Sequence, residues 1–127
     1  MGIMKNNIGI RNQTITPATL AVEIALTFGL LRNGTDGPRI PYGDALDWLA
    51  RSLKDRGQAF YSVTDGTGFY KGAEEPNLRL AIIAEDETID LEHLREAMAG
   101  LAREFAREFD QELVMYTEQA TRWSFIA

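Results

Sequence analysis

Residues 20–30 alternate strictly between large apolar side chains and small or polar ones. This period of two is typical of a half-buried strand. Thr16-Pro17 and Asn33-Gly34 resemble the two caps of a helix, so a helix is the alternative. Six successive matches to the strand period, several of them β-branched or aromatic, favour the strand. The apolar side consists of Leu20, Val22, Ile24, Leu26, Phe28 and Leu30.

Two later segments have the three-and-four spacing of amphipathic helices. Residues 33–43 hold three glycines and two prolines and form a loop, after which Asp44 caps the first helix and Gly57 ends it. Residues 86–90 open the second, longer helix, and their carboxylates suit its positive N-terminal end. The two apolar stripes are Leu46, Leu49, Ala50 and Leu53, and then Leu91, Leu94, Met98, Leu101 and Phe105.

The other periodic segments are short and predict strands. Residues 58–64 form one strand, and the glycines of 65–68 predict a hairpin turn after it, with a brief continuation through residues 69–71. Residues 78–84 and 111–117 form two more strands. A turn at 118–120 then leads into a last strand at 122–126.

This order of elements predicts an α+β, ferredoxin-like βαββαβ sandwich. Its antiparallel sheet carries two helices on one face and an extra C-terminal strand. A chain of 127 residues fits one core, so we expect a single domain over residues 17–127. Residues 1–16 form an N-terminal arm, in which Ile8, Ile10 and Ile15 make an edge strand or pack on a neighbouring subunit. A loosely held terminus is the alternative.

Two helices on one face leave the other face of the sheet to be solvated or covered. Phe28, Phe60 and Trp123 are aromatic candidates on the predicted strands. Ferredoxin-like domains often cover the open face with a second copy. By this analogy we expect a homodimer or a higher oligomer.

Composition and charge limit the kinds of partner that we expect for this chain. The net charge is −6, and residues 85–112 hold ten acidic and three basic residues, so one helix and its flanks carry the excess. Phosphate affinity rests on Lys and Arg, so we expect no nucleic-acid partner. Residues 1–11 lack the apolar run of a signal peptide, and residues 20–31 are too short to span a bilayer. With no cysteine in the chain, we expect a cytoplasmic protein without a membrane partner.

No pattern of a catalytic or metal site emerges. His93 is the only histidine and is expected on the solvated face of its helix, away from a positioned partner. Residues 85–90 lack the glycine and the closing glutamate of an EF-hand loop. Asp65-Gly66-Thr67 differs in order from the aspartic-protease motif and has no second copy. Nucleotide-binding loops and zinc motifs are also missing, so we expect no cofactor and no metal.

Two segments are candidates for ligand binding. In the hairpin of residues 66–72, Phe69 and Tyr70 would stack on a flat ligand and Lys71 would meet an anion. The alternative is an ordinary hairpin whose aromatic residues cover the edge of the core, and the adjacent Glu74-Glu75 would repel an anion. In the loop of residues 32–39, Arg32 and Arg39 precede a helix N-terminus and would hold a phosphate or carboxylate. Gln111, Glu112 and Arg122 would join either site or pair on the surface.

Several short motifs recur together in a known class of proteins. They are Phe28-Gly29-Leu30, Trp48-Leu49, the Gly-x-aromatic-x-Gly of residues 68–72, Glu75, and Gln111-Glu112-Leu113-Val114. In this order they resemble small uncharacterised bacterial and prophage proteins with a ferredoxin-like fold. The element order is also similar to that of ACT and PII-like regulatory domains. That resemblance implies ligand sites at loops and subunit interfaces.

Three functions follow as hypotheses. The first is a non-enzymatic, oligomeric protein that binds a nucleotide or another flat anionic metabolite. The second is a phage or mobile-element protein that inhibits a host protein through the acidic surface of Glu96, Glu104 and Glu108. The third is a hydrolase that uses Asp65, Glu74 or Glu75.

Overall fold

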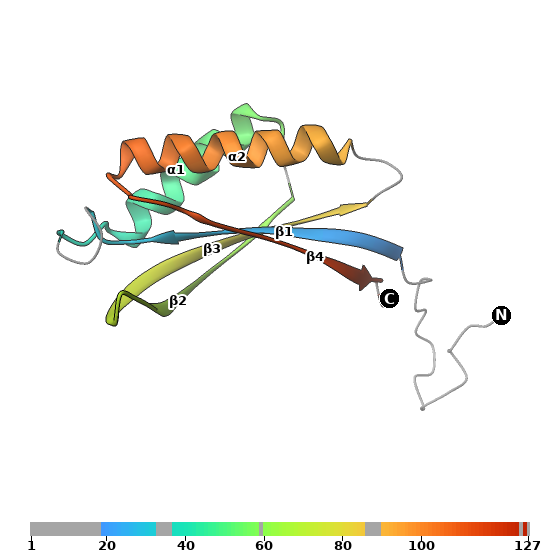
Figure 1. The fold of residues 1–127 in the computed structure, drawn as a ribbon. Coiled ribbons are helices and arrows are strands. Elements are labelled where there is room, and N and C mark those ends of the chain that lie inside the picture. The colour runs from blue at the N-terminus through green and yellow to red at the C-terminus, as the bar shows by residue number, and fades with distance from the viewer. Residues whose placement is uncertain (1–18, 33–36, 59, 86–89, 125, 127) are drawn as a thin grey trace.

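The computed structural model describes residues 19–32, 37–58, 60–85, 90–124 and 126, and the predicted N-terminal arm lies outside them. The described residues form an α+β fold of the ferredoxin-like kind, as predicted (Figure 1). The elements are β1 (Thr19–Gly29), α1 (Tyr42–Asp55), β2 (Ser62–Tyr70), β3 (Ala73–Glu85), α2 (Leu91–Glu108) and β4 (Met115–Trp123).

The four described strands form one antiparallel sheet in the order β2-β3-β1-β4. Both helices lie on one face of it, and we call the other side the open face (Figure 1). The strand predicted over residues 20–30 is confirmed. Its alternation turns Ile24, Leu26 and Phe28 toward the helices, where they are almost fully buried.

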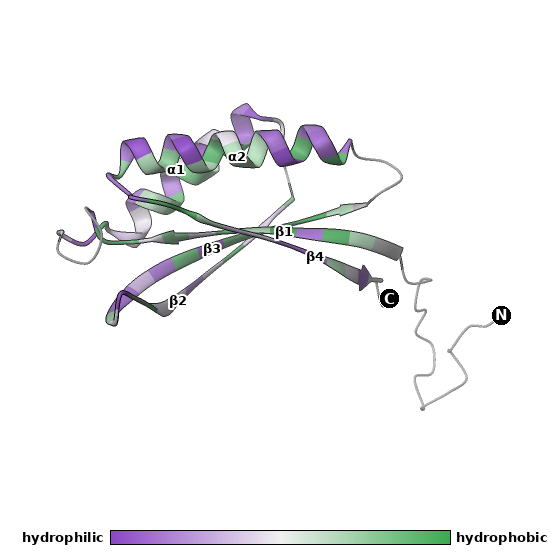
Figure 2. Cartoon of the chain, viewed as in Figure 1, coloured by the Kyte–Doolittle hydropathy of each residue, from purple (hydrophilic) through white to green (hydrophobic). Residues whose placement is uncertain are grey.

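The core lies between the sheet and the helices (Figure 2). In α1 the buried residues are Ala45, Leu49 and Leu53, so the predicted stripe is confirmed at Leu49 and Leu53 and wrong at Ala50, which is exposed. Four aromatic residues form a cluster within the core. The ring of Phe105 lies 4.2 Å from Phe28, 4.6 Å from Phe109 and 5.6 Å from Trp48 between centroids. The predicted stripe of α2 is confirmed, since Leu94, Met98, Leu101 and Phe105 are buried.

The predicted hairpin turn at residues 65–68 is wrong. These residues lie inside β2, and the chain turns instead at Lys71-Gly72, where both residues have positive φ (51° and 79°). Two successive positive φ values give the tight turn that matches the twist of antiparallel strands. Glycine was therefore a misleading signal at Gly66 and Gly68, which are strand positions facing the side chain of Asn77.

The predicted turn at residues 118–120 is also wrong. These residues continue β4, in register with Val22, Glu23 and Ile24 of β1. The polar residues of this segment suggested a turn. They are polar because β4 is an edge strand that is exposed along most of its length. Beyond Trp123, one bridge residue, Ile126, is described in the predicted C-terminal strand.

The helix ends differ in detail from the prediction. Asp44 lies in the first turn of α1, after a Pro41 cap, so its predicted role as the N-cap is wrong. Asp90 does cap α2, because its side chain accepts from the backbone N–H of His93 at 3.2 Å. Gly57 has φ 75°, which suits a chain leaving a helix. No helix among the described residues is long and apolar enough to cross a bilayer.

An ion-pair network fastens α2 to the edge strand β4. The guanidinium of Arg95 donates to both carboxylate oxygens of Glu118, at 2.8 and 2.7 Å, and to Glu92 at 2.6 Å. The hydroxyl of Tyr116 donates to Glu118 at 2.7 Å. These hydrogen bonds, that from Arg95 first, lower the pKa of Glu118 to about 2.

This network predicts an acid-sensitive contribution to stability. A carboxylate whose folded pKa is depressed stabilises the fold above its ordinary pKa, 4.5, and that contribution is lost as pH falls toward 2. We expect Glu118→Gln to lower Tm at pH 7, and the difference from the unmodified chain to shrink between pH 4.5 and 3. Thermal denaturation at several pH values measures this. Glu96→Gln, an exposed change on α2, is the control. A difference that does not depend on pH would contradict the assignment.

Candidate functional site

Three segments meet at one end of the sheet. They are the end of β1, the β2–β3 hairpin and the connection from α2 to β4. The N–H of Leu30 donates to the carbonyl of Pro76 at 2.9 Å, and Gln111 Nε2 donates to the carbonyl of Leu31 at 2.8 Å. Lys71 Nζ lies 3.7 Å from Glu112 Oε2. The structure thus brings together segments that the sequence marked separately.

At this end the carboxylate of Glu75 lies over the backbone of a glycine, Gly29. Gly29 is on the open face, and a Cβ built on it would be 2.2 Å from Glu75 Oε1 and 3.0 Å from Gln111 Oε1. The missing side chain is therefore what lets both groups reach over β1. We call Gly29, Glu75, Asn77 and Gln111 the carboxylate end of the open face.

The neighbouring backbone is bare as well. Gly66 and Gly68 of β2 are on the open face, and a Cβ on either would meet the side-chain amide of Asn77, at 3.2 and 3.0 Å. Strand positions without side chains allow a ligand to approach the main chain closely. Three glycines around one carboxylate and two amides therefore make a shallow polar platform.

Glu75 has an unusual environment. Burial raises the pKa of its carboxyl above the ordinary value of 4.5. Among the described residues, no ion pair or side-chain hydrogen bond holds this carboxylate. A half-buried carboxylate without a partner is a cost to the fold, and such groups concentrate at functional sites. Its oxygens can accept from hydroxyl groups or face a cation.

The predicted arginines have protein partners or lie apart. Arg32 donates to Asp110 Oδ2 at 3.1 Å and to the carbonyl of Glu108 at 3.2 Å, and its guanidinium lies 5.4 Å from the ring centroid of Phe109. These contacts fasten the loop after β1 to the end of α2. Arg39 is exposed, in an isolated bridge with Leu31.

The predicted hairpin residues lie at the end of β2 and in the turn after it. Phe69 is 77% exposed and its register with Glu74 puts it on the helix-facing side, while Tyr70 pairs with Ala73. Lys71 is in the turn beside Glu112. Arg122 pairs with Leu20 at the opposite end of the sheet, so the structure does not bring it near Lys71.

Sequence reasoning offered Gln111 as a member of either ligand site and Glu75 as a hydrolase residue, but it did not connect them with Gly29, and it did not single out Asn77. The signal that links them is register. Once β1 and β3 are aligned as antiparallel neighbours, Gly29 falls opposite Asn77, which is two residues from Glu75 on the same face. Single-strand periodicity carries no such cross-strand information.

The open face holds a second feature at its other end. A cleft of about 230 Å³ is lined by two aromatic residues and four strand residues, and we call it the aromatic cleft. Phe60 is 86% exposed there and Tyr61 36%. Its six residues are Glu23, Phe60, Tyr61, Ser62, Ala81 and Ile83.

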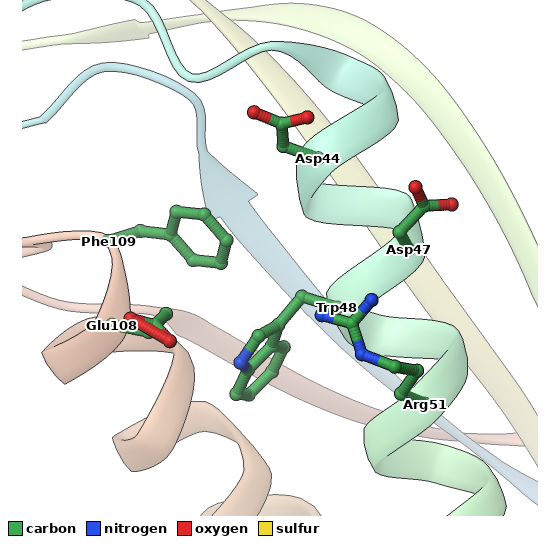
Figure 3. Close-up of a pocket in the computed structure, with 6 residues that line it drawn as sticks. All are labelled: Asp44, Asp47, Trp48, Arg51, Glu108 and Phe109. Carbon is green, nitrogen blue, oxygen red and sulfur yellow. The ribbon is translucent and has the colours of Figure 1, made fainter.

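A third hollow, the helix-side cleft, lies between α1 and the end of α2 and measures about 240 Å³ (Figure 3). Trp48 and Phe109 form its aromatic part, with their ring centroids 6.0 Å apart. Three carboxylates and one guanidinium surround them, so the cleft suits a cation better than an anion. The charged residues are Asp44, Asp47, Arg51 and Glu108.

The acidic groups elsewhere do not converge. Glu74 and Glu75 are successive strand residues and so point to opposite faces. Asp65 pairs with Leu78, several residues along β3 from both glutamates. Among the described residues, no group of three or more His, Cys, Asp or Glu side chains is placed to hold a metal ion. Glu104 of the predicted acidic surface forms an ion pair with Arg56. His93 is exposed in the first turn of α2.

Comparison with known proteins adds a fold-level relationship. No protein-family model and no curated protein sequence matches the chain. Two solved structures of phage SAM lyase are similar. The first, in complex with S-methyl-5'-thioadenosine, has a TM-score of 0.58 and 19% identity over 84% of this chain and 90% of the other. The second, in the apo state, has a TM-score of 0.58 and 23% identity over 87% and 90%. These values show a shared fold.

Proposed function

We propose that the chain binds an adenosine-containing small molecule of the S-adenosylmethionine class at the carboxylate end, as part of a homo-oligomer. The observation that carries this is the Glu75 carboxylate, which lies across Gly29 without a protein partner among the described residues. In dinucleotide-binding folds, a carboxylate accepts hydrogen bonds from ribose hydroxyls. In this proposal Glu75 does the same for a nucleoside on the glycine platform.

Charge at this end selects among nucleosides. Two carboxylates, those of Glu75 and Glu112, lie at this end with one ammonium group, that of Lys71, whose Nζ is 3.7 Å from Glu112 Oε2. An anionic ligand, as expected from the sequence, would be repelled, whereas a sulfonium cation or an uncharged nucleoside would not. S-adenosylmethionine has a sulfonium centre, and S-methyl-5'-thioadenosine, which one similar structure contains, is an uncharged nucleoside.

The lack of catalytic groups does not rule out turnover of such a ligand. A sulfonium is a good leaving group, so breaking its bond to carbon depends more on how the substrate is oriented than on a protein nucleophile. The chain has no cysteine, and His93 begins the helix at the end of the sheet away from Gly29. In the enzymatic form of this proposal, the carboxylate of S-adenosylmethionine itself attacks the carbon bonded to the sulfonium. A C–O bond forms as the C–S bond breaks, the sulfur keeps the electron pair, and S-methyl-5'-thioadenosine and a lactone are released.

Calorimetric titration of the purified chain tests the proposal. We expect S-methyl-5'-thioadenosine and S-adenosylmethionine to bind and adenosine monophosphate, the anionic comparator, to bind more weakly. Mass spectrometry of the S-adenosylmethionine mixture distinguishes plain binding from cleavage. Absence of binding by both sulfur nucleosides would refute the proposed function.

A second candidate function is docking on a basic partner protein, as a phage inhibitor would. The helix-side cleft favours it, because Trp48 and Phe109 offer aromatic surface to a guanidinium and three carboxylates surround it. Reversing charge at Asp44, Asp47 and Glu108 together should abolish such binding. Binding of an arginine-rich peptide that is unaffected by this change would argue against the idea.

A further inference from the structure

The helix-side cleft and the carboxylate end lie at the same end of the sheet, the first on the side of the helices and the second on the open face. Phe109 ends α2 as its C-cap and lines the cleft. Gln111 follows two residues later, and its side chain reaches over Gly29. The connection from α2 to β4 therefore has a residue in each of the two sites.

The lining of the helix-side cleft suits a planar cation. Trp48 reaches from α1 toward the end of α2, and its ring is nearly perpendicular to that of Phe109, at 81° (Figure 3). The three carboxylates of the cleft form no ion pair or side-chain hydrogen bond with a described residue, and one guanidinium, that of Arg51, lines the cleft with them. A guanidinium is planar, is less strongly hydrated than an ammonium group and stacks on aromatic rings. The cleft therefore favours a guanidinium ligand.

Two residues that line the cleft already hold a guanidinium of this chain. Arg32 Nη1 donates to the backbone carbonyl of Glu108 at 3.2 Å, and the guanidinium carbon lies 5.4 Å from the ring centroid of Phe109. The remaining contact of this side chain is an ion pair with Asp110 at 3.1 Å, between side chains that are 35% and 55% exposed. Ion pairs with this exposure contribute little to stability. A second guanidinium in the cleft would therefore compete with Arg32 for Glu108 and Phe109.

Arg32 also maintains a strained segment. Asp110 has a φ of 52°, a left-handed conformation that favours glycine. Such a conformation persists where surrounding contacts maintain it, and here Arg32 holds the Asp110 side chain. The next residue, Gln111, directs its side-chain oxygen to the open face because its amide nitrogen donates to the carbonyls of Leu31 and Phe109, at 2.8 and 3.1 Å. Release of Arg32 thus removes a restraint on Gln111 at the carboxylate end.

We infer that the helix-side cleft binds a guanidinium group in competition with Arg32, and that this binding weakens nucleoside binding at the carboxylate end. The guanidinium belongs to a small molecule or to an arginine side chain of a partner, and the chemistry of recognition is the same. The competition stands independently of the proposed function, whereas the effect on the nucleoside rests on it. Because coupling between two sites is reciprocal, the nucleoside should weaken guanidinium binding by the same factor.

Nuclear magnetic resonance of the indole N–H groups tests the site directly. The chain has two tryptophans, and of these Trp48 lines the cleft. L-arginine amide should shift the Trp48 signal and leave that of Trp123 in place, and L-lysine amide, which has an ammonium group instead, should bind about fivefold more weakly. Asp44→Asn combined with Asp47→Asn should weaken binding about tenfold. Asp55→Asn, at the other end of α1, is the control.

A peptide with a single arginine between glycines separates the two sources of the guanidinium. Tighter binding of this peptide than of L-arginine amide supports an arginine side chain of a partner. Equal or weaker binding supports a small molecule.

Arg32→Ala tests the competition. This variant should bind L-arginine amide about fivefold more tightly, whereas Arg107→Ala, which removes the same charge from the last turn of α2, should change the affinity by less than about twofold. In the unmodified chain, saturating L-arginine amide should raise the Kd of S-methyl-5'-thioadenosine about fivefold. In Arg32→Ala it should leave that Kd unchanged.

The outcomes separate the guanidinium site from the proposed function. No shift of the Trp48 signal by either arginine probe, or equal binding of L-lysine amide, refutes the site. Equal gains in affinity from Arg32→Ala and Arg107→Ala refute the competition. A nucleoside Kd that L-arginine amide leaves unchanged in the unmodified chain refutes the link between the two sites. Failure of the unmodified chain to bind S-methyl-5'-thioadenosine refutes the proposed function, and the resonance titration then decides the guanidinium site alone.

Discussion

Replacing Phe105 by alanine is expected to lower the free energy of unfolding by about 3–5 kcal/mol, as for other buried aromatic residues truncated in a core. Phe105 is fully buried, and its ring contacts three other aromatic rings from α1, β1 and the end of α2. Removing it opens a cavity where both helices meet the sheet. Domains of this size are stable by only about 5–15 kcal/mol, so the variant should lose a large share of its stability.

Urea denaturation followed by fluorescence of Trp48 and Trp123 measures the change. The matched control is Phe69→Ala, which removes an aromatic side chain that is 77% exposed and should change stability by less than about 0.5 kcal/mol. A loss below about 1 kcal/mol for Phe105→Ala would contradict the packing described for the aromatic cluster.

Replacing Glu75 by glutamine should weaken nucleoside binding and at the same time raise stability. Charge-assisted hydrogen bonds contribute about 1.5–3 kcal/mol, so their loss corresponds to a Kd about ten to a hundred times higher. The stability gain follows from burial, which raises the pKa of Glu75 and makes its charged form costly in the folded state. Loss of function with a gain in stability is typical of a site residue rather than a structural one.

The pH dependence has a definite sign. A carboxylate whose folded pKa is raised destabilises the fold once pH rises through that pKa, and it has no effect below its ordinary value of 4.5, where both states are protonated. The Tm of Glu75→Gln should therefore exceed that of the unmodified chain by up to a few degrees at pH 7, and the two should converge at acid pH. A lower Tm at pH 7 would show that Glu75 has a structural partner.

Gly29→Ala complements this variant. The new Cβ would displace the Glu75 carboxylate and the Gln111 amide, which lie within 3.0 Å of its position. Binding should weaken although every polar group of the carboxylate end is kept. Unchanged affinity would mean that the ligand does not use the Glu75 position described here.

The fold could be predicted from the sequence because its core elements have strong periodicity. The alternation of residues 20–30 favoured a strand over the alternative helix, and the stripe of α2 predicted both the helix and its buried side. The errors occurred where composition is a poor guide to backbone geometry. Gly66 and Gly68 read as a turn although they lie in a strand, and the polar edge strand β4 read as two pieces around residues 118–120.

The candidate site was predictable only in part. Arg32 and Lys71 were predicted to bind an anionic ligand because of their charge. In the structure Arg32 forms an ion pair with Asp110, and Lys71 lies beside Glu112. As a ligand-binding residue, Glu75 was noted only as a source of repulsion. Its position beside Gly29 depends on the pairing of β1 with β3 and so could not be predicted. Partner choice among charged groups and the pairing of distant strands are decided by tertiary contacts, which one sequence does not display.

The Lys71-Gly72 turn also determines how β2 aligns with β3. With two glycines on its open-face side and the half-buried Val63 packed against the core on the other, β2 has few side chains that resist sliding. A strand that slips by one residue exchanges its faces, and sparse packing permits such slips. The two-residue turn therefore sets the alignment. Lengthening it by one residue should disturb the site at Gly68 and Glu75 while leaving the aromatic cluster of the core in place.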